Sequence, residues 1–159
     1  MTALFIACLA LSGFTAIPLQ WEVDLLAGLV GVPDAGAPQP SSALIQWIGQ
    51  LQTALHDINA RYPFIGYGGD WLAFGHFAIA IAFIGAWRDP VRNRWLFDFG
   101  LLTCALLLPY ALVFGAARGI PLWWRLIDCS FGVFGAIPLW LCRRWTLELS
   151  RVTAPDGKP

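Results

Sequence analysis

Residues 97–117 read FDFGLLTCALLLPYALVFGAA, and this stretch decides the fold class. Asp98 is the one charged residue in it. An α-helix of this length rises about 31 Å at 1.5 Å per residue, which matches the roughly 30 Å hydrocarbon core of a bilayer. We therefore predict that residues 97–117 cross a membrane as a helix.

Three further apolar segments accompany it, at residues 3–19, 71–87 and 127–142. The 159-residue chain is 58% hydrophobic and only 13% charged, whereas soluble domains carry about 25% charged residues. We therefore predict an all-α integral membrane four-helix bundle, with residues 1–159 forming a single membrane domain. No Lys or Arg precedes Arg61, which argues against a signal peptide and for a retained first helix.

The excursion between the first two spans, residues 20–70, contains a segment with a different pattern. Pro and Gly in residues 32–40 predict a loop, and Ser41 or Ser42 is suited to cap the helix that follows. Apolar residues recur at helical spacing between residues 43 and 60, opposite polar side chains. This pattern predicts an additional amphipathic helix lying at the membrane interface. The glycines before Asp70 predict a turn, with Asp70 as the N-cap of the next span.

Basic residues predict the orientation. A basic loop at residues 88–94 and the tail at residues 143–159 belong on the cytoplasmic side by the positive-inside rule. Both termini are then cytoplasmic, and residues 20–70 form the extracytoplasmic side. Arg61, Arg118 and Arg125 oppose this arrangement. The composition and topology indicate an integral protein of a bacterial inner membrane.

Small residues predict which helix faces pack, because close contact between helices in lipid favours them. One stripe of the fourth span predicts a buried seam with Asp128 at its polar end; it comprises Arg125, Asp128, Gly132, Gly135 and Leu139. In the second span, Ala78, Ala82 and Ala86 form a second stripe of small residues. His76 lies on another face of that helix.

Ionisable side chains collect near one mouth of the predicted bundle: Asp70, His76, Arg118, Arg125 and Asp128. Charges in a bilayer usually pair, so we predict an ion pair between Asp128 and either Arg125 or Arg118. Both arginines flank a predicted loop at residues 119–124. Guanidinium groups suit phosphate or carboxylate, although snorkelling arginines at an interface also explain them.

The leading functional prediction is binding at an extracytoplasmic polar cavity. The ligand would be lipid-like or an anionic amphiphile, or the cavity would dock a membrane partner. The predicted ligand-binding residues are Tyr110, Arg118, Trp123, Trp124 and Arg125. Membrane lipid is the expected partner, alongside a membrane protein or a second copy of the chain.

Three alternatives remain open. One is ion or proton transport, which the sequence favours least because the cytoplasmic halves of the spans carry almost no polar side chains. In an intramembrane enzyme acting on a lipid-borne substrate, His76 would serve as acid or base, oriented by Asp70 or Asp128. Alternatively His76 would bind a metal or haem. His56, Asp70 and Asp128 are the convenient further ligands, but none has ligand-like spacing, so no metal residue and no cofactor is assigned.

Several functions find no support in the sequence. It contains no GxSxG, HExxH, phosphate-binding loop or Rossmann fingerprint. The net charge of zero gives no general attraction to nucleic acid. The four cysteines form no CxxC pair and are predicted to be small apolar side chains without disulfides.

Overall fold

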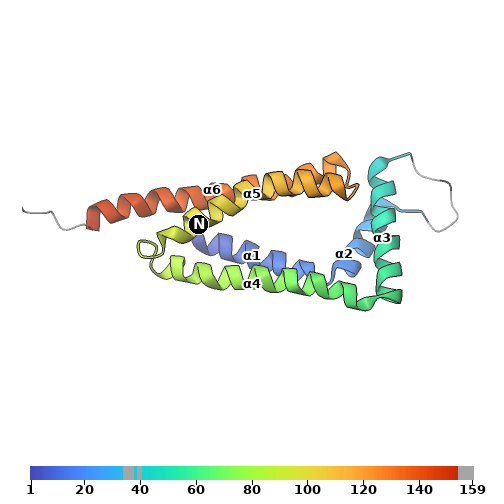
Figure 1. The fold of residues 1–159 in the computed structure, drawn as a ribbon, viewed down its shortest axis with the longest axis horizontal. Coiled ribbons are helices and arrows are strands. Elements are labelled where there is room, and N and C mark those ends of the chain that lie inside the picture. Colours follow the sequence, from blue (N-terminus) through green and yellow to red (C-terminus); the bar gives the residue numbers. More distant parts are fainter. Residues whose placement is uncertain (34–37, 39–40, 154–159) are drawn as a thin grey trace, which may run out of the picture. The chain divides into compact units, whose positions relative to one another are not determined.

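A computed structural model describes residues 1–33, 38 and 41–153, and all regular structure within them is helical. These described residues form six α-helices and one short 3-10 helix, η1, which can be followed in Figure 1. Their bounds are α1 Thr2–Ala16, α2 Leu19–Val30, α3 Ala43–Arg61, η1 Pro63–Gly66, α4 Tyr67–Arg88, α5 Arg94–Ala117 and α6 Leu122–Thr153. The all-α prediction is confirmed. Most of the predicted loop at residues 32–40, and residues 154–159 of the tail, lie outside the described residues.

Among the described residues, three stretches are long and apolar enough to cross a membrane: Pro63–Arg88, α5, and residues Leu122–Val152 of α6. The first predicted span corresponds to α1, which ends before Pro18, and α2 bends away from it by 87°. Proline cannot continue the hydrogen-bonding pattern of a helix, which explains the break. Taken together, α1 and α2 form a fourth candidate crossing.

The fourth predicted span is longer than expected at both ends. The predicted span was residues 127–142, whereas α6 begins at Leu122, directly after Pro121, and continues to Thr153. Trp123 and Trp124 therefore lie in the first turn of α6 instead of in a loop. Proline is well tolerated at the start of a helix, so Pro121 marks this boundary. The charged residues after Cys142 do not stop the helix, because Arg and Glu are good helix formers.

The predicted turn before the second span is wrong. Helix α4 starts at Tyr67, so Gly68 and Gly69 are helical and Asp70 lies inside the first turn. Asp70 therefore does not occupy the N-cap position. A carboxylate in the first turn is still favoured by the helix dipole. The amphipathic helix, by contrast, agrees closely with α3, and Ser42 stands at its N-cap position without a side-chain capping bond.

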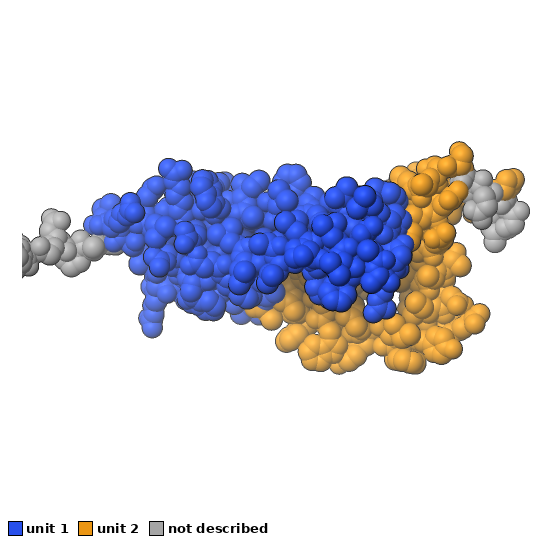
Figure 2. All heavy atoms as spheres, turned by 45° about the horizontal axis from the view of Figure 1, so that its top comes forward, with its two compact units in different colours: residues 1–8, 79–159 blue, residues 9–78 orange. Residues whose placement is uncertain are grey.

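The described chain divides into two compact units, coloured in Figure 2. Unit 1 comprises residues 1–8 and 79–159, and unit 2 comprises residues 9–78. In unit 2, α1 packs closely on the first half of α4. A Cβ at Gly13 would stand 2.8 Å from the Phe77 ring and 3.1 Å from the Ala73 carbonyl oxygen. Only glycine permits this approach of the two helices.

The second contact of unit 2 joins α2 to α3. The α3 residue Ile48 is fully buried, and Val23 and Ala27 of α2 are buried as well. Gly31 ends α2 with a left-handed φ of 72°, a conformation that favours glycine. The apolar face that the sequence predicts for residues 43–60 therefore faces α2 at least in part.

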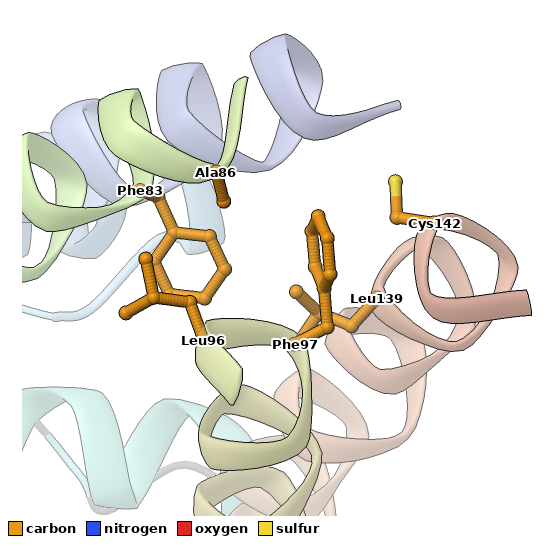
Figure 3. Packing of buried hydrophobic residues seen from close by; sticks show 6 residues of the cluster. All are labelled: Phe83, Ala86, Leu96, Phe97, Leu139 and Cys142. Atoms are coloured by element: carbon orange, nitrogen blue, oxygen red, sulfur yellow. The ribbon is translucent and has the colours of Figure 1, made fainter. Parts of the chain in front are cut away.

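Unit 1 has an apolar core made by three helices (Figure 3). Its fully buried centre is Phe83 of α4 and Phe97 of α5, whose ring centroids lie 6.3 Å apart. Phe5 of α1 packs on Phe83 at 4.8 Å. The remaining buried members of this cluster are Ala86, Leu96, Leu139 and Cys142.

The α5–α6 contact confirms the predicted glycine seam. A Cβ at Gly132 would lie 2.8 Å from the Cys104 carbonyl oxygen, and one at Gly135 would lie 3.4 Å from the Cys104 sulfur. Leu139 on the same stripe is 1% exposed. An ion pair between Asp98 of α5 and Arg143 of α6 joins the other end of the two helices. The two backbones therefore approach each other because glycine leaves room.

The predicted alanine stripe of α4 is largely wrong. Ala78 and Ala82 are exposed, and the buried small residues are Ala73, Ala80 and Ala86. The packed face is instead the one that includes Phe83, because burying a phenyl ring gains more packing than burying a methyl group.

Candidate functional site

The predicted site residues fall into both units. Asp70 and His76 belong to unit 2. Unit 1 contains the other six, which are Tyr110, Arg118, Trp123, Trp124, Arg125 and Asp128. The predicted site residues are therefore divided between the two units.

Arg125 binds the backbone of the neighbouring helix. Its Nη1 donates a hydrogen bond of 3.0 Å to the carbonyl oxygen of Leu112 in α5. Its aliphatic stem fills the space over Gly115, where a Cβ would lie 2.5 Å from the arginine Cδ. Arg125 thus joins the ends of α5 and α6 through a backbone carbonyl, a partner that the sequence did not predict.

The predicted ion pair of Asp128 is wrong for the part of the chain that the structure describes. The three arginine–carboxylate ion pairs found there, and the contact of His56 with Asp24, do not involve Asp128, Arg118 or Arg125. Asp128 is half-buried and Arg118 is exposed at the C-terminus of α5. The reason is geometric, because the bond to Leu112 already orients the Arg125 guanidinium.

Aromatic residues belong to the same two helices as these charges. The Trp123 and Trp124 rings meet edge to face at 5.6 Å, and Tyr110 packs on Phe114 at 4.5 Å. Tyr110 is 66% exposed. A belt of aromatic side chains at the end of two candidate spans is typical of a membrane–water interface.

His76 is held by its own helix. Its Nδ1 lies 2.8 Å from the carbonyl oxygen of Leu72, one turn earlier, and therefore carries the proton that it donates. This bond defines the tautomer and leaves Nε2 as an acceptor. The partner is thus a backbone carbonyl, neither Asp70 nor Asp128.

A polar network that sequence reasoning missed lies between α2 and α3. Asp24 Oδ1 accepts hydrogen bonds from Gln52 Nε2 at 2.9 Å and from His56 Nε2 at 2.8 Å. His56 Nδ1 lies 3.1 Å from Gln20 Nε2, and Gln20 Oε1 accepts a bond from Asn59. Two residues of α2 are therefore bonded to three residues of α3.

The donor and the acceptor of each hydrogen bond in this network can be assigned consistently. Because the Gln20 carbonyl is occupied by Asn59, its amide nitrogen faces His56 and donates to Nδ1. His56 then carries its proton on Nε2 and donates it to Asp24, as a neutral ring does. Both bonds to Asp24 end on Oδ1. Within the described ranges, Oδ2 accepts no hydrogen bond.

A pocket of about 810 Å³ adjoins this network inside unit 2. Its walls come from the end of α1, from α2, α3 and η1, and from the start of α4. The polar lining consists of Gln20, Asp24, Asn59, Tyr67 and Asp70, and the apolar lining includes Ile17, Leu19, Leu55, Ile58 and Ile65. Of the predicted site residues, Asp70 lines this pocket.

The network also acts on the ionisation of Asp24. Hydrogen bonds from Gln52 and then from His56 lower the pKa of this carboxyl group below its ordinary value of 3.8. Hydrogen bonds donated to a carboxylate favour its charged form. Asp24 is therefore a stable negative charge at neutral pH.

Acid is expected to loosen the α2–α3 contact. Because the pKa of folded Asp24 lies below 3.8, its contribution to stability is present above that pH and is lost as the pH falls through the folded value. Denaturant unfolding in mild detergent at pH 5 and pH 3 should show a larger loss of stability in wild type than in Asp24→Asn. Glu22→Gln, which removes a carboxylate of α2 without hydrogen bonds in this network, should retain the wild-type loss. Equal losses in wild type and Asp24→Asn would contradict the assignment.

Comparison of the chain with protein-family models, curated proteins and solved structures finds no match. Within residues 1–33, 38 and 41–153, no group of three or more His, Cys, Asp or Glu side chains is arranged to hold a metal ion. The features of this chain that bear on its function are therefore the geometry and charge of the pocket and of the helix ends.

Proposed function

We propose that this chain is a multi-pass membrane protein that binds a lipid-like amphiphile in the pocket of unit 2. The observation that carries the proposal is the pocket itself, where apolar walls meet the hydrogen-bonded residues Gln20, Asp24 and Asn59. Its volume of about 810 Å³ falls in the range of about 300–1,000 Å³ that is usual for small-molecule sites.

The lining suits a molecule with two chemically different ends. Leu55 and Ile58, one turn apart on α3, offer branched aliphatic side chains to a hydrocarbon chain. The amide and carboxylate groups at α2 offer hydrogen bonds to a polar head. Burial of hydrocarbon gives most of the affinity, and a few placed polar groups give orientation.

The membrane context supports the same ligand class. Helices α4, α5 and α6 cross the bilayer in our proposal. The fourth crossing is α1, which lies within the first predicted span, and α2 bends away from it. By the positive-inside rule the termini are cytoplasmic, so the pocket opens at the extracytoplasmic leaflet of a bacterial inner membrane. A lipid-like molecule would reach the pocket from that leaflet.

An anionic amphiphile at the α5–α6 end is the second candidate. Arg118 is exposed and has no ion pair within the described ranges, and the Trp123–Trp124 pair lies a few residues away. Guanidinium beside aromatic rings suits a phosphate or carboxylate head at the interface. Arg125 is the weaker ligand, because it is bonded to Leu112.

An enzyme using His76 is a third candidate, with one observation in its favour. The bond from Nδ1 to Leu72 leaves the Nε2 lone pair available to accept a proton. If the chain is such an enzyme, His76→Gln should lose turnover of a lipid-borne substrate while the purified protein remains folded. A misfolded His76→Gln would assign the residue to structure instead.

Photolabelling tests the pocket. The probe is a dodecyl alcohol with a diazirine in its chain, applied to protein in mild detergent, with labelled peptides read by mass spectrometry. We expect labels in α2, α3 and the start of α4. Leu55→Trp fills the pocket and should reduce this labelling at least about tenfold, which corresponds to 1.4 kcal/mol. Leu44→Trp makes the same change on α3 away from the lining and should label like wild type.

The other possible labelling results distinguish between the candidate binding sites. Equal pocket labelling in Leu55→Trp, Leu44→Trp and wild type would refute the pocket as the binding site. Labelling confined to residues 110–128 and lost in Arg118→Ala would favour the second candidate. Copurifying molecules identified from wild type and from both tryptophan variants give an independent readout.

A further inference from the structure

The two units of the chain carry opposite net charges. Residues 9–78 contain five acidic residues and one basic residue, Arg61, so unit 2 has a net charge of −4 with neutral histidines. Residues 1–8 and 79–159 contain five acidic and nine basic residues, so unit 1 has a net charge of +4. The chain has a net charge of zero because the opposite charges of the two units cancel.

The pocket lining is negatively charged, like unit 2 as a whole. Two carboxylates, Asp24 and Asp70, line it, and no Lys or Arg is found in its described lining. Arg61, the single basic residue of unit 2, pairs with Asp57 at 2.8 Å on the same helix. No cation of unit 2 is therefore placed to neutralise the two lining carboxylates.

The Asp24 carboxylate is oriented and still has capacity to bind. Gln52 and His56 both donate to Oδ1, which leaves Oδ2 without a hydrogen bond in the described residues. A carboxylate accepts about four hydrogen bonds, so Oδ2 can receive a donor from a ligand. Its charge persists because the same two bonds favour ionisation.

Aromatic rings complete the polar end. Trp21 and Tyr67 line the pocket, and both are more than half exposed. Ammonium groups are attracted to the faces of such rings, and cages of aromatic side chains recognise quaternary ammonium. A carboxylate or phosphate head would instead be repelled by the two aspartates.

We propose that the pocket selects amphiphiles with a cationic ammonium head, which reverses the sign that the sequence alone suggested for the ligand. This inference rests on the proposed function of the pocket and specifies its ligand class. The ammonium group would lie between Asp24, Asp70 and the two aromatic rings, and the hydrocarbon chain would lie along Leu55 and Ile58.

The experiment uses three diazirine probes with the same dodecyl chain, ending in trimethylammonium, carboxylate or alcohol. Binding is measured on the full chain in uncharged detergent as the concentration that gives half-maximal pocket labelling. We expect the trimethylammonium probe to bind at least about tenfold more tightly than the carboxylate probe. The alcohol probe should lie between them. Raising the salt concentration should narrow the differences.

Charge-neutral variants test the residues. Asp70→Asn should weaken binding of the trimethylammonium probe about fivefold, since removing one unit charge near an exposed partner has about that effect. Binding of the uncharged alcohol probe should change by a smaller factor. Asp24→Asn should act in the same direction. Glu22→Gln removes an equal charge of α2 that does not line the pocket, and should change no probe more than about twofold.

The outcomes separate the two proposals. If the alcohol probe labels the pocket and all three probes bind equally, the cationic preference is wrong and the proposed function stands. The cationic preference would also be wrong if the carboxylate probe bound more tightly than the trimethylammonium probe and Asp70→Asn did not alter this difference. If no probe labels the pocket, the proposed function itself fails.

Discussion

Phe83→Ala is expected to lower the free energy of unfolding by about 3 kcal/mol. Phe83 is fully buried and contacts aromatic rings of two other helices, Phe5 and Phe97. Truncation leaves a cavity that the surrounding helices cannot fill completely. This loss of stability lies at the low end of the range for the cores of water-soluble proteins. On unfolding, the Phe83 ring moves from the apolar core into apolar lipid or detergent and not into water.

Unfolding in mixed micelles of dodecyl maltoside and SDS, followed by circular dichroism, measures this change. The matched control is Phe134→Ala on α6, which removes the same side chain from a position that is 69% exposed. It should change the free energy of unfolding by no more than about 0.5 kcal/mol. Similar losses in both variants would mean that the cluster around Phe83 is not the core of unit 1.

Gly132→Ala is expected to lower the free energy of unfolding by about 2 kcal/mol. The new methyl group would lie 2.8 Å from the Cys104 carbonyl oxygen, which belongs to the backbone of α5. A side chain could rotate away from this clash, but a helical carbonyl cannot. The two helices must therefore separate, and the contacts of Leu139 with α5 weaken.

Gly75→Ala on α4 is the control, because beyond the adjacent residues and the backbone of its own helix no atom lies within 4 Å of the added methyl group. It should be neutral or slightly stabilising, since alanine is the better helix former. The same micelle unfolding applies to both variants. Equal stability of Gly132→Ala and Gly75→Ala would refute a close α5–α6 contact.

The seam that Gly132→Ala tests could be predicted because its signal is local. Gly132, Gly135 and Leu139 recur at three- and four-residue spacing, which places them on one face of any helix. The amphipathic α3 was predicted for the same reason. Propensity and periodicity act over a few residues and do not require knowledge of the partner helix.

Helix boundaries and helix partners were predicted less well. The prediction placed the start of the fourth span at residue 127, where the apolar segment begins. Helix α6 instead begins at Leu122, so Pro121 would have marked the helix start better. The prediction that Ala78, Ala82 and Ala86 form the packed face of α4 was largely wrong. Several faces of that helix are apolar, and spacing alone does not say which face meets a neighbour. The packing of Phe83 determines which face of α4 is buried.

The polar network had a partial sequence signal. Gln20 and Asp24 are four residues apart, and Gln52, His56 and Asn59 follow at spacings of four and three, so each set occupies one helix face. Nothing in the spacing says that the two faces meet, because Gln20 and His56 are 36 residues apart. Only the packing of α2 on α3 joins them.

The amino-acid order by itself determined the helices and the apolar stretches suited to a membrane, because hydrophobicity and backbone propensity are properties of neighbouring residues. The tertiary structure decided which charges meet: it bonds Arg125 to a backbone carbonyl, sets Asp24 beside His56, and places Asp70 in an acidic pocket. Such pairings depend on distances between separate helices, and those distances are set by side-chain packing along the whole contact.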